Sequence, residues 1–336
     1  MKSTDFAKCL SNYLSIYLPV RKNVSENTIK SYRDTFKLFL TYCQDAVGIK
    51  VERVGFCDID LKLIENFLDW LAAERQCTVS SCNQRLAALR SFFRYAQIEA
   101  PEYIAHIQGI LSIPMKKTAS IPVNYLTTEC VRLLLTQPNT ATSSGRRDLA
   151  LLSLLYDTGA RVQELVDLSI KDLRLEHPAK VRLYGKGRKI RDVPLMENTV
   201  SLLRIYLSEL KDSGYASGDT PLFRNRSDKR ITRAGVSYIL NKYFDKTKPQ
   251  MAGLPDSISP HAMRHSKAMH LLQAGINIFY IKDLLGHADI STTEIYAHAD
   301  IEMKRAALMA VDVPLVPKSV PAWAKDEELL SWLSRL

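Results

Sequence analysis

The residues with the clearest chemical potential lie on one predicted helix, where His261 and Arg264 are three positions apart. Residues at this spacing are neighbours on one helix face. Ser259 and Pro260 precede them and mark a helix start, whose first backbone N–H groups are free. The planar guanidinium of arginine matches two phosphate oxygens, and an imidazole can hold a third oxygen or move a proton. The pattern therefore predicts an anion site suited to phosphate.

A tyrosine follows this segment. The run LLGH at 284–287 and the run STT at 291–293 lead to Tyr296. A phenol beside a phosphate can attack phosphorus and leave a covalent phosphotyrosine, which stores the energy of the broken bond. The sequence thus indicates nucleophilic phosphoryl transfer by Tyr296.

A metal centre is the alternative to test, because five of the seven histidines lie between residues 261 and 298. However, the chain has no HExxH motif and no cysteine after Cys130. Arg264 and Lys267 lie among the histidines and would repel a cation. We therefore predict no metal site.

The elements that position these residues form two groups. In residues 1–110, apolar side chains recur at three- and four-residue intervals and predict helices, the third of them at 80–97. Ser80 and Ser81 are the expected cap of that helix. Its polar face carries Asn83, Arg85, Arg90 and Arg94. Such a face either lies on DNA or is simply solvated, and spacing alone favours solvation.

The second group begins with a helix-start signal at Thr127 and surrounds a few short extended runs. The runs are 170–175, 180–184 and 189–194, with Gly185-Lys186-Gly187 as the turn of a hairpin. Further helices are expected at 148–156, 161–168, 197–211, 233–244, 261–274 and 278–285. The predicted fold is mainly α with a small antiparallel β-sheet.

The chain divides by composition into two domains, a connector and a tail. Residues 113–122, IPMKKTASIP, are a basic stretch between prolines and predict a connector between domains at 1–112 and 123–310. The tail, 311–336, is interrupted by prolines and ends in an amphipathic segment at 326–336. A helix of about eleven residues is not stable alone, so it docks either on its own domain or on a neighbouring subunit.

The composition fits a folded protein with an anionic partner. The 336 residues include 46 Lys and Arg against 36 Asp and Glu, a net charge of +10. A positive surface favours nucleic acid, since each neutralised phosphate releases counterions. No apolar stretch approaches the ~20 residues of a membrane helix. The six cysteines show no zinc spacing, so we expect a cytoplasmic protein with free thiols.

Five motifs stand in a specific order along the second domain. They are TGARVQEL at 158–165, GKG at 185–187, HAMRH at 261–265, LLGH at 284–287 and TTEIYAH at 292–298. Together they closely resemble the tyrosine recombinases, the family of phage integrases, Xer recombinases and related transposases. The run NQRLAALRSFF at 83–93 is similar to the family's helical core-DNA-binding domain. The resemblance implies that 123–310 is an α+β catalytic domain.

The resemblance also implies a catalytic set. Its members are Arg161, Lys186, His261, Arg264, His287 and Tyr296, with Glu164 as a residue that orients the site. Tyr296 would attack a phosphodiester to give a 3′-phosphotyrosine and a free 5′-hydroxyl. Arg161 and Arg264 would hold the non-bridging oxygens, and Lys186 would protonate the leaving oxygen. His261 would accept or relay the tyrosine proton, and His287 would bond the phosphate. No metal or nucleotide cofactor is needed.

DNA recognition follows from the same resemblance. The helix at 233–244 is similar to the family's major-groove helix, which adds Arg233 and Lys242 to the candidate DNA contacts of the 80–97 face. With that face, it would form a two-domain clamp around the duplex. Arg188, next to the GKG turn, is a further candidate DNA contact. The implied partners are double-stranded DNA with inverted-repeat core sites and further copies of the chain. A dimer would occupy one site and a tetramer the synapsis, with a second recombinase or accessory proteins as further options, and the protein would be nucleoid-associated.

The biological programme stays open at this point. The proline-interrupted tail favours integration or excision of a mobile element over the compact Xer type. Xer-type dimer resolution and DNA inversion use the same chemistry. A type IB topoisomerase and a non-catalytic DNA-binding regulator are the alternatives from other classes.

Overall fold

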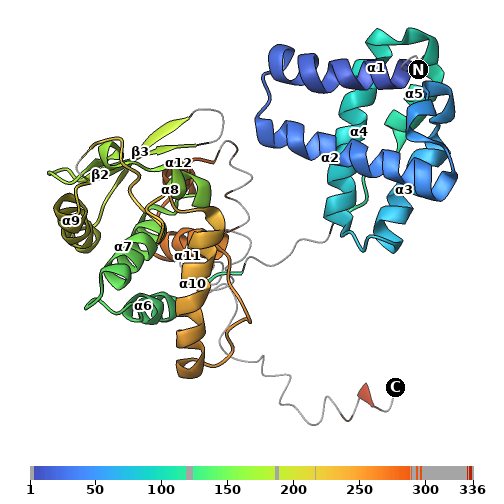
Figure 1. The fold of residues 1–336 in the computed structure, drawn as a ribbon. Coiled ribbons are helices and arrows are strands. Elements are labelled where there is room, and N and C mark those ends of the chain that lie inside the picture. The colour runs from blue at the N-terminus through green and yellow to red at the C-terminus, as the bar shows by residue number, and fades with distance from the viewer. Residues whose placement is uncertain are drawn as a thin grey trace. The chain divides into compact units, whose positions relative to one another are not determined.

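The computed structural model describes residues 4–118, 124–185, 189–215 and 217–287, together with residues 289, 293, 296, 331, 333 and 334. The chain forms two compact units, Met1–Ile121 and Pro122–Leu336, and their division falls within the predicted connector (Figure 1). The predicted tail helix at 326–336 lies outside the described residues except for Ser331, Leu333 and Ser334. In the part of the chain that is described, no helix combines the length and apolar character needed to cross a membrane.

The described residues of the N-terminal unit form helices and no β-strand. The longer helices are α1 (Asp5–Asn12), a π-helical continuation (Tyr13–Arg21), α2 (Glu26–Tyr42), α3 (Leu61–Ala73), α4 (Val79–Glu99) and α5 (Ile104–Ser112). The predicted cap of α4 at Ser80 and Ser81 was wrong. The helix begins earlier, because the hydroxyl of Thr78 accepts a hydrogen bond from the Ser81 N–H at 3.2 Å.

Aromatic rings fill the interior of this unit. The ring of Phe92 on α4 packs edge-on against Phe6, Tyr13 and Phe36, with centroid separations of 5.5, 5.3 and 5.0 Å. Edge-to-face pairs of this kind stabilise a core beyond the burial of their area. Since these rings come from α1, α2, the π-helical turns and α4, one aromatic cluster joins the elements.

The C-terminal unit combines helices with one small sheet. Its elements are α6 (Thr128–Thr136), α7 (Ser143–Thr158), α8 (Val162–Asp167), β1 (Leu173–Arg174), β2 (Lys180–Tyr184), β3 (Ile190–Pro194), α9 (Glu197–Asp212), α10 (Arg233–Thr247), α11 (Pro260–Gln273) and α12 (Ile278–Leu285). The strands pair antiparallel in the order β1-β2-β3. The prediction of a mainly helical chain with one small antiparallel sheet is confirmed.

The sheet differs from the prediction in its first strand. Residues 170–172 form a 3-10 turn instead of extended chain, because the carboxylate of Asp172 accepts a hydrogen bond from the Ser169 N–H at 2.8 Å. The hairpin between β2 and β3 closes with the Gly185 N–H donating to the Lys189 carbonyl at 2.7 Å. The tip of that hairpin, residues 186–188, lies outside the described residues.

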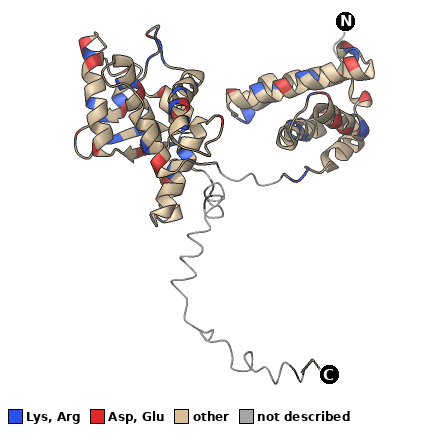
Figure 2. Ribbon diagram, turned by 90° about the horizontal axis from the view of Figure 1, so that it is seen from below, with Lys and Arg blue, Asp and Glu red and all other residues tan. Residues whose placement is uncertain are grey.

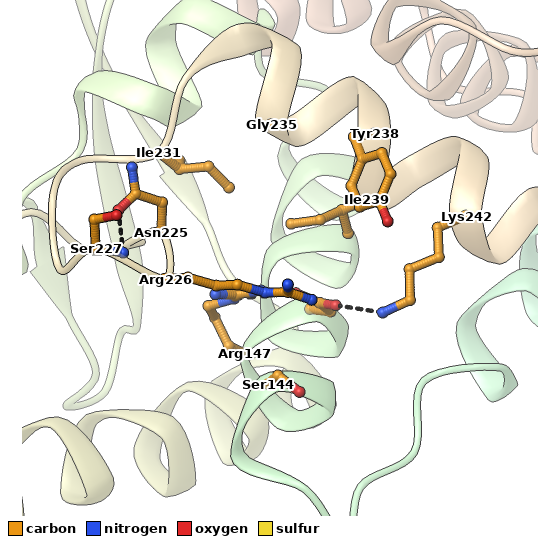
Figure 3. A pocket seen from close by; sticks show the side chains of 11 residues that line it. Ser144, Arg147, Asn225, Arg226, Ser227, Ile231, Gly235, Tyr238, Ile239 and Lys242 are labelled. Carbon is orange, nitrogen blue, oxygen red and sulfur yellow. Dashed lines mark hydrogen bonds and ion pairs between the residues drawn. The ribbon is translucent and has the colours of Figure 1, made fainter.

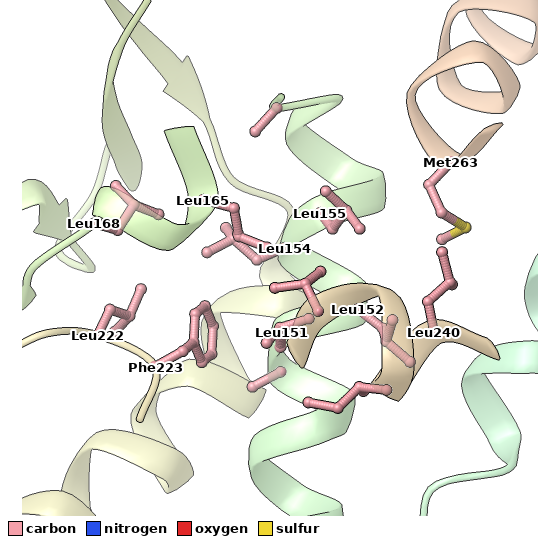
Figure 4. Close-up of a cluster of buried hydrophobic side chains, with 14 of the residues drawn as sticks. Leu151, Leu152, Leu154, Leu155, Leu165, Leu168, Leu222, Phe223, Leu240 and Met263 are labelled. Atoms are coloured by element: carbon pink, nitrogen blue, oxygen red, sulfur yellow. The ribbon is translucent and has the colours of Figure 1, made fainter. Parts of the chain in front are cut away.

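Helix α7 runs through the middle of the unit's hydrophobic core. Residues 150–155 are all buried, and the leucines among them contact Leu165, Leu222, Phe223 and Leu240 from surrounding elements (Figure 4). Acidic and basic residues are interspersed over the helices of each unit (Figure 2). The core therefore fixes α7 rigidly, and the segment that follows α7 begins the candidate site.

Candidate active site

The site starts where α7 ends, at a glycine in a left-handed conformation. Gly159 has φ +55°, and a Cβ atom there would lie 2.6 Å from Cδ2 of Leu285. Only glycine fits such a turn without strain and without moving a neighbour. The turn exposes the Gly159 carbonyl to α11 and leads directly into Arg161, the residue before α8.

Arg264 on α11 is held by two backbone carbonyls. Its Nη1 donates to Gly159 O and its Nη2 to Leu285 O, both at 2.7 Å, and the residue is 3% exposed. Among the described residues no carboxylate forms an ion pair with it. Burial, and then the charge of Arg161, lowers the pKa of Arg264 to about 10. The group stays cationic at neutral pH, so the site keeps a buried positive charge without an acidic partner.

Glu164 orients two further arginines. Its carboxylate accepts from Nη1 of Arg161 at 2.9 Å and from the Arg161 N–H at 2.9 Å. It also accepts from both Nη atoms of Arg191, at 3.1 and 2.7 Å. Burial alone would raise the pKa of Glu164, but the hydrogen bonds and charge of Arg191, followed by those of Arg161, bring the pKa below its usual value. One carboxylate thus fixes two guanidinium groups.

Arg191 belongs to this cluster although the motifs did not single it out. It lies on β3 opposite Leu183 of β2, and Leu183 is buried. Residues directly opposite in an antiparallel pair point to the same face. On β3, Arg191 and Val193 are two positions apart and therefore point to the same, inward face. This alternation of side chains is the sequence signal that could have identified Arg191.

Tyr296 lies between two histidines. Its hydroxyl is 2.9 Å from Nδ1 of His265, and the residue is 1% exposed. Its ring stacks on that of His287 at a centroid distance of 6.4 Å, and Nδ1 of His287 is 2.8 Å from the hydroxyl of Thr293. Burial raises the pKa of Tyr296, while the charges of Arg264 and Arg161 act in the opposite direction. Burial, and then three nearby arginines, lower the pKa of His287 to about 4.

His261 is the expected acceptor or relay of the tyrosine proton. His261 is exposed at the start of α11, and the phenol hydrogen-bonds to His265, one helical turn further on. The two imidazole rings are 6.2 Å apart. Partial loss of solvent, and then the charges of Arg264 and Arg161, lower the pKa of His261. Arg264 lies three positions after His261 on α11. His265 was missed as a contact although it ends the HAMRH motif.

The structure therefore brings together five of the six predicted catalytic side chains and Glu164. Lys186 is the sixth and lies, with Arg188, outside the described residues. The cluster contains three arginines and one carboxylate, and that carboxylate, Glu164, pairs with Arg161 and Arg191 only. Its excess positive charge suits an anion such as a phosphodiester. Within the described ranges no group of three or more His, Cys, Asp or Glu side chains could hold a metal ion.

Comparison with known proteins identifies the family. Residues 124–303 match the model of the "Phage integrase family", and residues 11–99 match that of "Phage integrase, N-terminal SAM-like domain". The chain belongs to the phage integrase family of tyrosine recombinases. It is a site-specific DNA recombinase, an enzyme that cleaves and rejoins DNA strands.

Relatives of this recombinase cover most or all of its length. The integrase/recombinase y4rC of Sinorhizobium fredii is 38% identical over 338 residues, with 100% of this chain and 99% of the relative covered. Tyrosine recombinase XerD of Staphylococcus epidermidis is 32% identical over 290 residues, with 86% and 93% covered.

Two solved structures share the fold. XerH recombinase bound to difH DNA aligns with a TM-score of 0.67 at 22% identity, over 87% of this chain and 82% of that chain. The Tn1549 transposon integrase with transposon right-end DNA gives 0.66 at 20% identity, over 90% and 98%.

The predicted DNA contacts of the recombinase's N-terminal unit are mostly engaged within that unit. The side-chain amide of Asn83 donates from Nδ2 to the Lys116 carbonyl at 2.7 Å and accepts at Oδ1 from the Lys116 N–H at 3.0 Å. Arg85 donates to Ser31 O and to the hydroxyl of Thr35, and Arg90 donates to Leu111 O at 2.9 Å. Arg94 is exposed on the same helix. Three of the four side chains thus also stabilise the unit that carries them.

In the C-terminal unit, α10 borders a pocket of about 460 Å³ (Figure 3). Lys242 on α10 lies 3.5 Å from the carboxylate of Asp148, which also accepts from Arg147 at 2.7 Å. Arg226 and the exposed Tyr238 complete the basic and aromatic lining. Arg233 is exposed at the first turn of α10. The exposed face of α10 is therefore basic around this pocket.

Proposed function

We propose that this recombinase integrates and excises a mobile element, with Tyr296 forming a 3′-phosphotyrosine with DNA. The observation that carries the chemistry is the position of the Tyr296 phenol, hydrogen-bonded to one histidine, stacked on another and influenced by Arg161 and Arg264. A phenol in a cationic site is suited to attack a phosphodiester, because the arginines stabilise the charge that builds on phosphorus oxygens.

The proposed roles divide among the cluster. Arg161 and Arg264 hold the non-bridging oxygens, and Glu164 orients Arg161 by accepting from its backbone N–H and its guanidinium. Arg191, held by the same carboxylate, adds positive charge. His287 bonds the phosphate, and the exposed His261, whose ring centroid is 6.2 Å from that of His265, is the proposed relay for the tyrosine proton. Lys186, on the hairpin, is the proposed general acid for the leaving 5′-oxygen.

Two relatives support the mobile-element programme. The integrase/recombinase y4rC aligns with 100% of this chain, whereas the tyrosine recombinase XerD aligns with 86% of it. The transposon integrase shares the fold. Xer-type dimer resolution is the second candidate, favoured by the identity of 32% to XerD.

The proposed partner is double-stranded DNA with inverted-repeat core sites. Arg94 of the N-terminal unit and Arg233 and Lys242 of the C-terminal unit are the proposed contacts with the duplex. A dimer would occupy one site and a tetramer the synapsis, with the 326–336 segment docking on a neighbouring subunit. This activity would place the protein on the nucleoid.

The test uses DNA that flanks the chain's gene. Duplexes from both flanks are incubated with the wild type and with Tyr296→Phe, and covalent adducts are resolved on denaturing gels. We expect a mapped adduct with the wild type and none with the variant, at equal DNA binding. An adduct that persists in Tyr296→Phe would refute the nucleophile.

A plasmid carrying both flanks separates the programmes. Excision of the intervening DNA supports a mobile-element recombinase, whereas relaxation of supercoiled DNA without any flank supports a topoisomerase. For the general acid, Lys186→Ala should lose cleavage of normal DNA and regain it when sulfur replaces the 5′-leaving oxygen. Full activity of this variant on normal DNA would exclude Lys186.

A further inference from the structure

His265 contacts the reacting atom of the site and has no role in the mechanism above. Its Nδ1 lies 2.9 Å from Oη of Tyr296, within hydrogen-bond distance, and the tyrosine is buried. Water therefore has little access to the phenol. A proton that leaves Oη in this environment needs an acceptor already in place, and His265 is the group positioned to receive it.

The protonation states of the pair are set by its surroundings. Burial, and then the neighbouring charges of His261 and Arg264, lower the pKa of His265, so its imidazole is neutral at pH 7. Burial raises the pKa of Tyr296, so its phenol keeps its proton. A neutral phenol can donate to a neutral imidazole, and the tautomer that receives this bond carries its own proton on Nε2 and accepts through the lone pair of Nδ1.

We propose that His265 is the proton acceptor for Tyr296, and this assignment rests on the recombinase chemistry proposed above. As Oη attacks phosphorus, the O–H bond breaks, its electrons stay on Oη to form the O–P bond, and the proton passes to Nδ1 of His265. The P–O5′ bond breaks, and the leaving oxygen takes a proton from the general acid. In rejoining, the 5′-hydroxyl attacks phosphorus and gives its proton back to the general acid. The bond between Oη and phosphorus breaks, and the proton on His265 returns to Oη.

DNA binding makes this acceptor stronger. In the free protein, the charge of Arg264, the next residue before His265, disfavours a proton on the imidazole. A phosphate held by Arg264 and Arg161 would neutralise that charge. His265 would therefore gain basicity when the substrate arrives, which suits a base that must act only in the complex.

The same helix contains a matched control. Nδ1 of His270 lies 2.8 Å from Oη of Tyr156, so α11 carries two histidine–tyrosine pairs of similar geometry. Nε2 of His270 bonds the Leu126 carbonyl at 2.9 Å, and Tyr156 has no part in the proposed reaction. Substitution of His270 therefore reports the structural cost of losing such a pair without the chemistry.

The experiment measures single-turnover cleavage of a nicked duplex that carries the mapped site. His265→Asn keeps an amide near the position of Nδ1 but takes up no proton. We expect cleavage at pH 7 to fall roughly 100-fold or more, the usual contribution of a general base. Its rate should then rise about tenfold per pH unit from 7 to 9, because the phenol must ionise unaided. His270→Asn should retain the wild-type rate and pH profile.

Chemical rescue provides the second variant. His265→Gly leaves space for a free imidazole, and we expect added imidazole to restore cleavage by this variant but not by His265→Asn. A variant that cleaves as fast as the wild type, or faster, would overturn the proposal by showing that the bond merely restrains Tyr296. Slow cleavage with the wild-type pH profile and no rescue would also overturn it. If the wild type forms no Tyr296-dependent adduct, the proposed function fails instead.

Discussion

The two units bury different kinds of side chain. In the described part of the N-terminal unit, the single buried polar side chain is that of Thr35, and aromatic rings occupy the centre. The C-terminal unit buries Asp148, Glu164, Asp172, Arg264 and His287 beside its leucines. Burying an ion costs several kcal/mol unless partners compensate it. One unit is thus a hydrophobic scaffold, and the other buries ionisable side chains, of which Glu164, Arg264 and His287 belong to the candidate site.

The interactions that hold the two units together differ in directionality as well as in energy. Hydrophobic packing is non-directional, so the rings of the N-terminal unit stabilise without fixing a particular atom. The hydrogen bonds of Arg264 and Glu164 fix particular nitrogen and oxygen atoms. Substitutions should therefore separate the units: changes to the C-terminal network alter cleavage, and changes to the N-terminal unit alter stability or DNA affinity.

The largest effect is expected from Arg264→Ala. Removing a guanidinium from the position where phosphate charge develops should slow single-turnover cleavage about 100- to 1000-fold, measured at saturating protein. Arg90→Ala is the control, because Arg90 also donates to a backbone carbonyl but belongs to the N-terminal unit. We expect Arg90→Ala to cleave normally once bound. An equal loss of cleavage in both variants would break the comparison.

Glu164→Gln should have the next largest effect. It removes the carboxylate between Arg161 and Arg191, and breaking a buried pair costs about 3–5 kcal/mol of unfolding free energy. Pulse proteolysis in urea resolves the fragments of each unit and measures this loss in the C-terminal unit alone. The control is Asp192→Asn on β3, which breaks exposed pairs with Lys180 and Arg182. A loss as great as that of Glu164→Gln would show that burial is not decisive.

Acid should destabilise the C-terminal unit selectively. His287 stays neutral in the fold down to a pKa of about 4, whereas an unfolded chain takes up protons from about pH 6.5. The unfolded state then binds more protons, so the free energy of unfolding falls as the pH drops from about 6.5 to about 4. The fall is at most about 1.4 kcal/mol per pH unit, and screening by solvent reduces it. The urea midpoint at pH 7.5 and 5 measures it. In the N-terminal unit, His106 is exposed, and an equal shift there would contradict the cause.

The smallest effect should be the same in both units. Thr78 caps α4 and Thr127 caps α6, each accepting from a backbone N–H at 3.2 Å. Replacing either with alanine should cost about 1 kcal/mol, and replacing either with serine should cost less. Urea midpoints of the four variants test this. A loss of stability confined to one unit would show that the contribution of helix caps also differs between the two units.

Local signals in the sequence predicted most of the elements. The bounds of α12, Ile278–Leu285, and of β2, Lys180–Tyr184, agree with the prediction, because periodicity and turn residues are read over a few neighbours. The start of α4 was misplaced because three hydroxyl residues, Thr78, Ser80 and Ser81, compete for the cap. Propensity cannot rank them when all three suit the position.

Motifs predicted which residues gather in the site but not how they pair. The order of the motifs placed Arg161, Arg264 and Tyr296 in one cluster. Which histidine meets the phenol depends on how α11 is rotated against the segment with Tyr296, and sequence spacing carries no information on that rotation. Arg191 escaped notice for a related reason, since its partner Glu164 is 27 positions away.

The two backbone carbonyls that bind Arg264 also affect the stability of the whole C-terminal unit. Because Gly159 and Leu285 offer dipoles and no negative charge, the guanidinium is incompletely compensated before substrate arrives. A phosphate bound there, as proposed above, would supply the missing charge. Because it would bind only the folded state, it would raise the free energy of unfolding in proportion to the logarithm of its concentration. On this proposal, DNA is a thermodynamic component of the folded C-terminal unit as well as its substrate.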